Sequence, residues 1–129
     1  MIEILAPVSP GELIDKITIL QIKRERFTDA AKLHHVQLEL DVLTAARDRA
    51  IAASPQMDRF AAELKSVNEI LWQVEDDIRV CDHHADFGPR FVELARSVYR
   101  NNDRRCAIKR QINDLLGSQL VEEKSYKTH

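Results

Sequence analysis

Apolar residues recur along this chain at alternating spacings of three and four, which place side chains on one face of an α-helix. The clearest example lies between residues 60 and 81, where the pattern continues for about three heptads. Its apolar positions are Phe60, Leu64, Val67, Leu71, Val74, Ile78 and Cys81. The sequence therefore predicts a long helix with a coiled-coil seam in this region.

The first predicted helix begins with a capping box in the stretch VSPGEL. Ser9 takes the N-cap position, Pro10 the first helical position and Glu12 the third. In this arrangement the serine hydroxyl and the glutamate carboxylate accept hydrogen bonds from backbone amides that the helix leaves free. Apolar residues follow at helical spacing, and we expect the helix to end near Phe27. They are Leu13, Ile14, Ile17 and Leu20.

Three further helices follow from the same kind of signal. The second is expected at residues 29–53, with an inner face of Leu33, Val36, Leu40 and Leu43. Ser54 and Pro55 end it and supply the N-cap and first position of the third helix. Gly88 and Pro89 precede the fourth, and Gly117 ends it as a C-terminal glycine. The apolar face of the fourth consists of Phe91, Leu94, Val98, Ile108, Ile112 and Leu115.

Short connections between long helices favour antiparallel neighbours. We therefore expect an all-α protein, an antiparallel helical bundle of about four helices, in a single domain over residues 1–129. Residues 1–8 would form an arm or a short strand, and residues 119–129 a polar tail that is ordered only where it docks. An unbroken fourth helix would span about 43 Å against roughly 26 Å for the first. Such an overhang would expose apolar surface unless the fourth helix breaks at Asn101–Asn102 or a second subunit covers it. We expect a homodimer.

Composition narrows the class of protein. Three glycines and 5% aromatic residues are few for a sheet protein, and the formal charge of −2 gives no overall attraction to nucleic acid or to an anionic membrane. No stretch approaches the ~18 apolar residues of a membrane span. Glu3 stands where a signal peptide would need positive charge, so we expect a cytoplasmic protein whose two cysteines, Cys81 and Cys106, remain thiols.

The polar run RNNDRR, residues 100–105, interrupts the apolar face of the fourth helix. Helical spacing places three of its residues on the inner side of the helix, namely Asn101, Asn102 and Arg105. Arg96, Arg100 and Arg104 follow one another at intervals of four and form a stripe of guanidinium groups. Such a stripe could bind a phosphate, a carboxylate or a sugar acid.

The favoured interpretation of this stripe is nevertheless intramolecular. Residues 87–118 carry seven basic and three acidic side chains, whereas residues 63–86 carry seven acidic and two basic ones. An antiparallel hairpin turning near residue 86 would set Arg96 opposite Glu75 and Asp76. It would also set Arg100 opposite Trp72 in a cation–π contact. Nucleic acid is an unlikely partner, because acids interleave the stripe and no aromatic series accompanies it.

A second polar stripe, formed by Asn68, Trp72, Glu75 and Arg79, lies beside the seam of the third helix. It could line a polar pocket between helices, or Trp72 could simply fill volume at the bundle edge. In a ligand site, Arg and Lys would bind an anion, Asn would donate hydrogen bonds, and Trp and Tyr would stack. The candidate ligand-binding residues are Asn68, Trp72, Arg96, Tyr99, Arg100, Asn102, Arg104, Arg105 and Lys109.

Metal binding and catalysis find little support. The histidine pairs at residues 34–35 and 83–84 point their side chains about 100° apart on a helix and cannot normally hold one ion together. No Gly-x-Ser-x-Gly elbow and no glycine-rich phosphate loop occurs. We assign no catalytic residue, metal or cofactor, and leave open whether the protein is an enzyme.

The phrases SPGELIDKITIL, VNEILWQVEDDIR, FVELARSVYRNND, IKRQIN and VEEKSY, found in this order between residues 7 and 127, resemble a small bacterial family known only as a domain of unknown function. The resemblance implies a compact helical protein and carries over no catalytic residue. It also suggests a link to surface-polysaccharide genes. The motif phrases contain Ser9, Glu12, Asp15, Lys16, Asn68, Trp72, Arg79, Arg96, Tyr99, Asn102, Asp103, Lys109, Asn113, Glu123, Lys124 and Tyr126.

The stretch ELIDKITILQIKRERF is also similar to the first helix of the all-helical chorismate mutases. That fold requires a longer first helix with a substrate-binding arginine near its start, where this chain has Ser9, Pro10 and Gly11. The similarity stops at one helix. The sequence thus predicts a non-enzymatic, dimeric interaction or accessory protein, with a protein partner possible. The alternative is a binding module or enzyme for a small anionic ligand.

Overall fold

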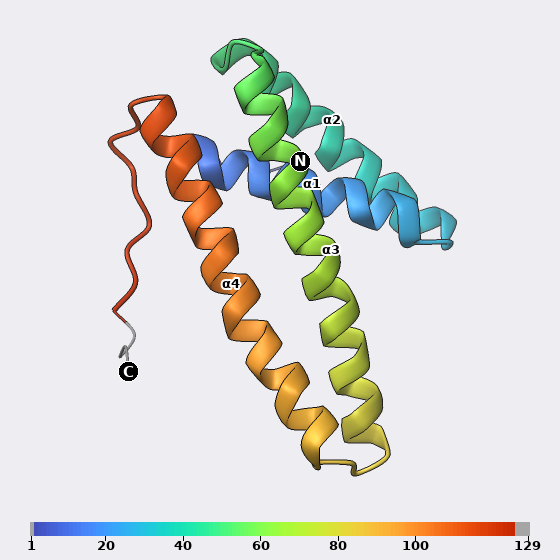
Figure 1. Ribbon diagram of the computed structural model, residues 1–129. Helices are drawn as coiled ribbons and strands as arrows, with labels where there is room; N and C mark the ends of the chain where they lie inside the picture. Colours follow the sequence, from blue (N-terminus) through green and yellow to red (C-terminus); the bar gives the residue numbers. More distant parts are fainter. Residues whose placement is uncertain (1, 126–129) are drawn as a thin grey trace.

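The computed structural model describes residues 2–125, which leaves out Met1 and residues 126–129. Four helices follow one another: α1 (Pro10–Arg26), α2 (Ala30–Ala50), α3 (Pro55–His83) and α4 (Pro89–Leu115) (Figure 1). The described part of the N-terminal arm, residues 2–8, forms neither helix nor strand. The all-α class and the helical bundle predicted from the sequence are confirmed.

The N-caps predicted at the two serines are present, but the Glu12 carboxylate pairs with Lys109 instead of closing the predicted capping box on the Ser9 amide. The Glu12 amide donates to Ser9 Oγ at 3.1 Å, and the Met57 amide donates to Ser54 Oγ at 3.1 Å. At the other end of the chain, Gly117 has φ of 65°, a conformation that costs glycine little. The Ser118 amide then donates back to the Asn113 carbonyl at 2.9 Å, which completes a Schellman C-cap. Local capping chemistry therefore sets where α1, α3 and α4 begin or end.

The second helix ends earlier than the sequence predicts, at Ala50 rather than Ala53. Ile51 leaves the helix with φ of −123° and ψ of 121°, an extended conformation. Its side chain packs against both apolar clusters of the core. The half-buried Ile51 is thus the C-cap of α2, and an extended segment leads from it into the cap of α3.

The helices form two antiparallel pairs, and α1 crosses the α3–α4 pair (Figure 1). Among the helices, α2 packs on α1 alone. One apolar cluster joins α1 to α3 and α4, and it contains Ile14, Met57, Leu64, Val67, Leu71, Ile108 and Ile112. The other joins α1 to α2, and it contains Leu13, Ile17, Leu20, Val36 and Leu40. α1 is therefore the central helix, buried on both sides.

The fourth helix is continuous through Asn101 and Asn102, with no break where the polar run interrupts its apolar face. Its 27 residues span about 40 Å. α3 has 29 residues and runs beside it (Figure 1), and Val74 and Cys81 of α3 are buried. α3 lies along the overhang without burying it fully, because Phe91, Leu94 and Val98 of α4 are only half-buried there. Leu115, predicted to face inward, is 41% exposed.

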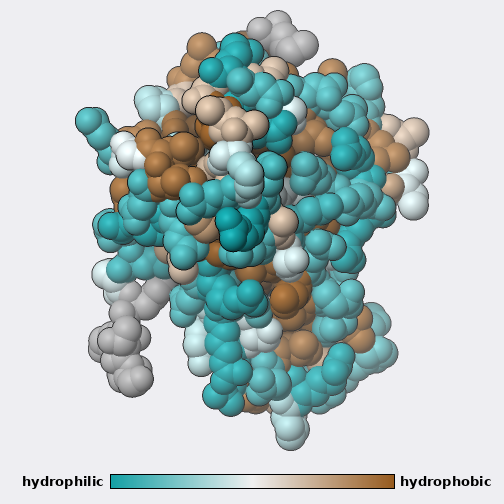
Figure 2. All heavy atoms as spheres, turned by 45° about the horizontal axis from the view of Figure 1, so that its top comes forward, coloured by the Kyte–Doolittle hydropathy of each residue, from teal (hydrophilic) through white to brown (hydrophobic). Residues whose placement is uncertain are grey.

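The surface carries several exposed apolar side chains, and Figure 2 shows them as brown patches on a mostly hydrophilic face. Ile2, Ile4 and Leu5 of the arm are 85–90% exposed, and Leu38 and Val42 of α2 are 53% and 54% exposed. Among residues 2–125, no helix has both the length and the apolar character needed to cross a membrane. Cys81 is buried, Cys106 is half-buried, and neither forms a disulfide.

Candidate functional site

The carboxylate of Asp15 lies at the point where α1 crosses α3 and α4. Its side chain is fully buried, and it accepts hydrogen bonds from Arg105 Nε at 2.9 Å and from Arg105 Nη2. The hydrogen bond and charge of Asp15 raise the pKa of Arg105 against the opposing effect of burial. Removing one partner of such a buried pair costs about 3–5 kcal/mol. The pair therefore fixes how α1 and α4 meet.

Asn68 of α3 completes this network. Its Nδ2 donates to Asp15 Oδ1 at 2.9 Å and to Thr18 Oγ1 at 3.0 Å. The Thr18 hydroxyl in turn donates to the Asp15 carbonyl oxygen at 2.8 Å. Three helices are thus joined by polar side chains, each of which has a partner as burial requires.

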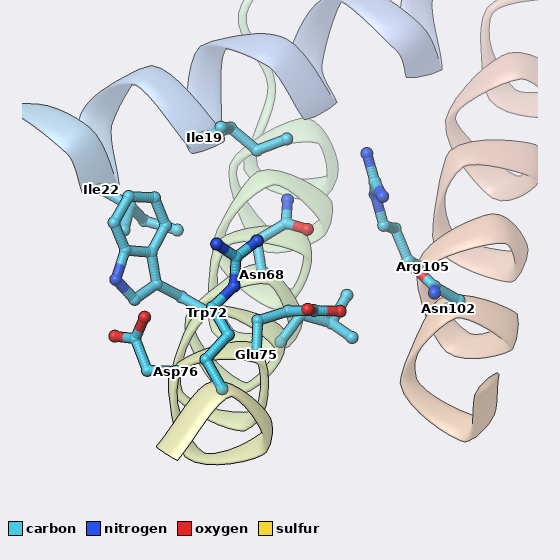
Figure 3. A pocket seen from close by; sticks show the side chains of 10 residues that line it. Ile19, Ile22, Asn68, Trp72, Glu75, Asp76, Asn102 and Arg105 are labelled. Carbon is cyan, nitrogen blue, oxygen red and sulfur yellow. The ribbon is translucent and has the colours of Figure 1, made fainter. Parts of the chain in front are cut away.

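A cleft of about 520 Å³ opens beside this network, between α1, α3 and α4. The volume lies within the range of about 300–1,000 Å³ that small-molecule sites occupy. Figure 3 shows Ile19 and Ile22 reaching it from α1, Trp72 and Glu75 from α3, and Arg105 from α4. The remaining lining residues are Asn68, Leu71, Asp76, Arg79 and Asn102.

Several polar groups in the cleft have no internal partner. The side chains of Glu75, Asp76 and Arg79, which are exposed, and of the half-buried Asn102 make no hydrogen bond or ion pair with any residue between 2 and 125. Arg105 has five N–H donors, and Asp15 takes up only the Nε and Nη2 positions. The cleft consequently offers two carboxylates, two guanidinium groups and an amide to a molecule entering from solvent.

The chain's single tryptophan, Trp72, forms one wall of the cleft and is itself held from the side of α1. Arg26 lies over the indole at 5.8 Å from the ring centroid, and the ring of Phe27 lies 6.0 Å away at an angle of 53°. The part of the indole that these residues leave uncovered lines the cleft. Trp72 therefore presents part of an aromatic surface to the cleft.

The ion pairs predicted between α3 and α4 do not form as expected. Arg96 and Arg100 pair with Glu93 of their own helix, at 3.7 and 3.3 Å. Arg26, rather than Arg100, makes the cation–π contact with Trp72. The predicted charge zipper is wrong at Arg96 and Arg100, because α1 crosses the hairpin and its Arg26 takes the contact with Trp72. Arg90 of α4 does pair with Asp77 of α3, at 3.7 Å.

The structure divides the candidate residues of the sequence into groups. Asn68, Trp72, Asn102 and Arg105 lie together in the cleft. Arg96, Tyr99, Arg100 and Arg104 do not line it, and the nearest partner of Arg104 is Asn101 Oδ1 at 3.5 Å. Lys109 lies in a separate, smaller pocket. The inward placement predicted for residues 101, 102 and 105 holds, since Asn101 is buried and the other two are half-buried.

The smaller pocket has a volume of about 200 Å³ and shares Asn102 and Arg105 with the cleft. Lys109 Nζ contacts Glu12 Oε2 at 2.7 Å and Glu122 Oε2 at 2.8 Å. Burial lowers the pKa of Lys109, but its hydrogen bonds to Glu12 and Glu122 outweigh that effect and the net shift is upward. The Lys109 hydrogen bond lowers the pKa of Glu122. This lysine is therefore charged and almost wholly removed from solvent.

The backbone approaches closely where α1 meets this end of α4. The Gly11 amide donates to Asn113 Oδ1 at 2.8 Å. A Cβ at Gly11 would lie 2.5 Å from the Lys109 carbonyl oxygen, closer than atoms can approach. Glycine at this position lets α1 dock on α4 and brings Glu12 to Lys109.

Within residues 2–125, no three His, Cys, Asp or Glu side chains gather as a metal site would require. A family model covers residues 4–129 and is described as a family of unknown function, DUF6165. The chain belongs to this family. The match confirms the resemblance to a domain of unknown function. No curated protein and no solved structure matches the chain.

Sequence reasoning missed Asp15 as the centre of the site in this DUF6165 protein, although the residue lies in one of the motif phrases. The available signal was its position in LIDKITIL, where apolar residues surround a charged one on nearly every side of the helix. A helix that is apolar all round is buried, and a charge within it must then have a partner. Tyr126, another motif residue, lies outside the described residues.

Proposed function

We propose that this protein is a non-enzymatic binding module that holds a small hydroxylated acid, such as a sugar acid, in the cleft between α1, α3 and α4. The observation that carries the proposal is the set of polar groups without internal partners, Glu75, Asp76, Arg79 and Asn102, beside the half-buried Trp72. The bacterial and cytoplasmic setting expected from the sequence remains part of this proposal.

Arg79 is the group of the cleft that would pair with an acid, and the two carboxylates beside it limit that acid to a single negative charge. Asp15 compensates the charge of Arg105, so Arg79 is the one lining guanidinium without a carboxylate partner among residues 2–125. Glu75 and Asp76 would repel a phosphate dianion more strongly than a carboxylate. These carboxylates and Asn102 are hydrogen-bonding groups suited to sugar hydroxyls, while the indole gives a flat apolar surface.

Intrinsic fluorescence tests this proposal directly, because the emission of the chain comes mainly from Trp72. Titration with D-glucuronate should change it saturably, and D-glucose at equal concentration should change it much less. The same ligand should raise the free energy of unfolding, by about 2.7 kcal/mol at one hundred times its Kd.

Arg79→Gln should weaken glucuronate binding at least tenfold, whereas Arg96→Gln, a matched change outside the cleft, should leave it unaltered. If neither glucuronate nor a panel of related sugar acids changes the emission or the stability of the wild type, the proposal is wrong. An equal loss in both variants would show that binding is nonspecific attraction to positive charge.

A second candidate function is self-association, which the outer face of α2 favours. Its residues at positions 31, 35, 38, 42 and 45 are exposed and follow the alternating spacing of four and three that a partner helix requires. Leu38 and Val42 lie at the centre of this stripe. A second copy of the chain would bring an identical stripe, which is the condition for a two-fold interface.

Light scattering at micromolar concentration should then give about twice the chain mass of 14.8 kDa. Leu38→Glu should return the protein to a monomer, whereas Leu120→Glu, another exposed leucine far along the chain, should not. A wild-type mass near that of one chain would rule out the dimer. It would not affect the proposal that the cleft binds a ligand.

A further inference from the structure

The C-terminal segment that follows α4, residues 118–125, lies against the protein through charged contacts. Glu122 pairs with Lys109 at 2.8 Å and Glu123 pairs with Arg110 at 3.4 Å. Leu120 is 47% exposed, and the only hydrogen bonds of Ser118 Oγ are local ones to Leu120. Within the described residues the segment has no helix or strand that would hold it in place. The carboxylates of Glu122 and Glu123, together with the half-buried Val121, thus attach the segment to the helices.

The pocket at Lys109 is suited to an acid. The lysine side chain is only 8% exposed, and its ammonium group points into a pocket whose lining is almost entirely polar. Arg105 and Asn102 form the side that this pocket shares with the cleft. Glu12, fixed in the first turn of α1, supplies one negative charge to Lys109, and Glu122 supplies a second from the segment.

The two carboxylates differ in how they are held. Glu12 belongs to a helix that is buried on both sides and capped by Ser9. Glu122 is on a segment outside the helices and its side chain is 45% exposed. Removal of Glu122 from the pocket would leave Lys109 with one carboxylate and a free N–H donor facing solvent.

We propose that Lys109, with Arg105 and Asn102, forms an anion-binding site that the chain's own Glu122 occupies, and that an external carboxylate or phosphate takes the place of Glu122 and releases residues 118–125. This site is additional to the cleft at Trp72, and it would bind an acid even if the cleft bound none. The segment competes with the external anion for the same site. If it occupies the site for about nine-tenths of the time, the site is free for about one-tenth, and the apparent Kd of the anion rises about tenfold.

Hydrogen exchange of residues 118–125 in the full chain tests the site, with inorganic phosphate and D-glucuronate as probes and chloride at equal ionic strength as control. Phosphate or glucuronate should accelerate exchange of the segment saturably, and chloride should not. Calorimetry should show about tenfold tighter binding of the same probe to Glu122→Gln. Glu123→Gln removes only the exposed contact with Arg110 and leaves the Lys109 contact in place, so it should tighten binding much less.

Lys109→Met should abolish binding at this site. Because that variant also strands Glu12 and could fail to fold, the decisive comparison is between the two glutamate variants. If phosphate and glucuronate accelerate exchange no more than chloride, or if Glu122→Gln binds them no more tightly than Glu123→Gln, the contact is purely structural and the proposal fails. Emission of Trp72 that responds to glucuronate while the segment stays protected would overturn this inference and leave the proposed function standing.

Discussion

The carboxylate of Asp15, which has no contact with water, is the group on which the geometry of the cleft depends most directly. It orients Arg105 from α4 and Asn68 from α3, and both of these residues line the cleft. A buried charge is tolerated only when its partners are in place. The same contacts that hold α1 to the hairpin therefore set the positions of the polar groups that would meet a ligand.

Asp15→Asn should lower the free energy of unfolding by about 3 kcal/mol, at the low end of the range for a broken buried pair because the Arg105 side chain is 29% exposed. Urea denaturation followed by circular dichroism measures this loss. Asp103→Asn is the matched control, since Asp103 is exposed and has no ion pair or hydrogen bond among residues 2–125. Equal stability of the two variants would contradict the role given to Asp15.

Residue-scale predictions from the sequence succeeded where the cause was local. Ser9 and Ser54 were identified as caps because the hydrogen bonds of a cap involve residues within three positions. Arg96 and Arg100 were misplaced because the choice between Glu93 and the acids of α3 depends on the crossing of α1. Nothing in the spacing of residues along one helix reveals such a crossing.

At the scale of elements, α1 and α2 differ sharply in how many neighbours they have. α1 contacts all three other helices, whereas α2 contacts α1 alone. The apolar spacing of both helices was read correctly from the sequence, since Leu33, Val36, Leu40 and Leu43 are all buried or half-buried. The spacing of apolar residues could not reveal that α1 would be buried on two sides and α2 on only one.

The inner and outer leucines of α2 should respond differently to truncation. Leu40→Ala should lower the free energy of unfolding by about 2–4 kcal/mol, because Leu40 is 4% exposed and packs among Leu13 and Ile17. Leu38→Ala, at 53% exposure, should cost less than about 1 kcal/mol. Thermal denaturation at low protein concentration measures both and keeps any self-association out of the comparison. A larger loss of unfolding free energy in Leu38→Ala than in Leu40→Ala would contradict the assignment of Leu40 to the buried face of α2 and of Leu38 to its exposed face.

At the scale of the whole molecule, ionisable groups from three separate parts of the chain meet at Lys109. Glu12 comes from α1, Arg105 from α4, and Glu122 and Lys124 from the C-terminal segment. Because the pKa of Glu122 is lowered, its contact with Lys109 is fully present above the ordinary carboxyl pKa of 4.5 and is lost as pH falls through the lower value in the folded protein. Because the pKa of Lys109 is raised, the contact persists as pH rises to its ordinary value of 10.5 and is lost above it.

Protection of residues 118–125 from hydrogen exchange, corrected for the intrinsic rate at each pH, should accordingly be constant between the ordinary pKa values of 4.5 and 10.5 and decrease as pH falls below 4.5. In Glu122→Gln the protection should be low at every pH. Retention of protection in that variant, or a loss centred near neutral pH, would mean that other contacts hold the segment.

The central position of α1 also sets an order of events during synthesis. Gly11 and Asn113, which bond directly, are 102 residues apart in sequence, so α1 leaves the ribosome long before its partners on α4 exist. Until α3 emerges α1 can pair only with α2, and until α4 follows its other side, with Ile14, Asp15 and Ile22, lacks the complete hairpin that buries it. The nascent chain must therefore protect that side of α1 or keep the helix unformed. We expect α1 to be the segment at which chaperones bind, or aggregation begins, while the chain is incomplete.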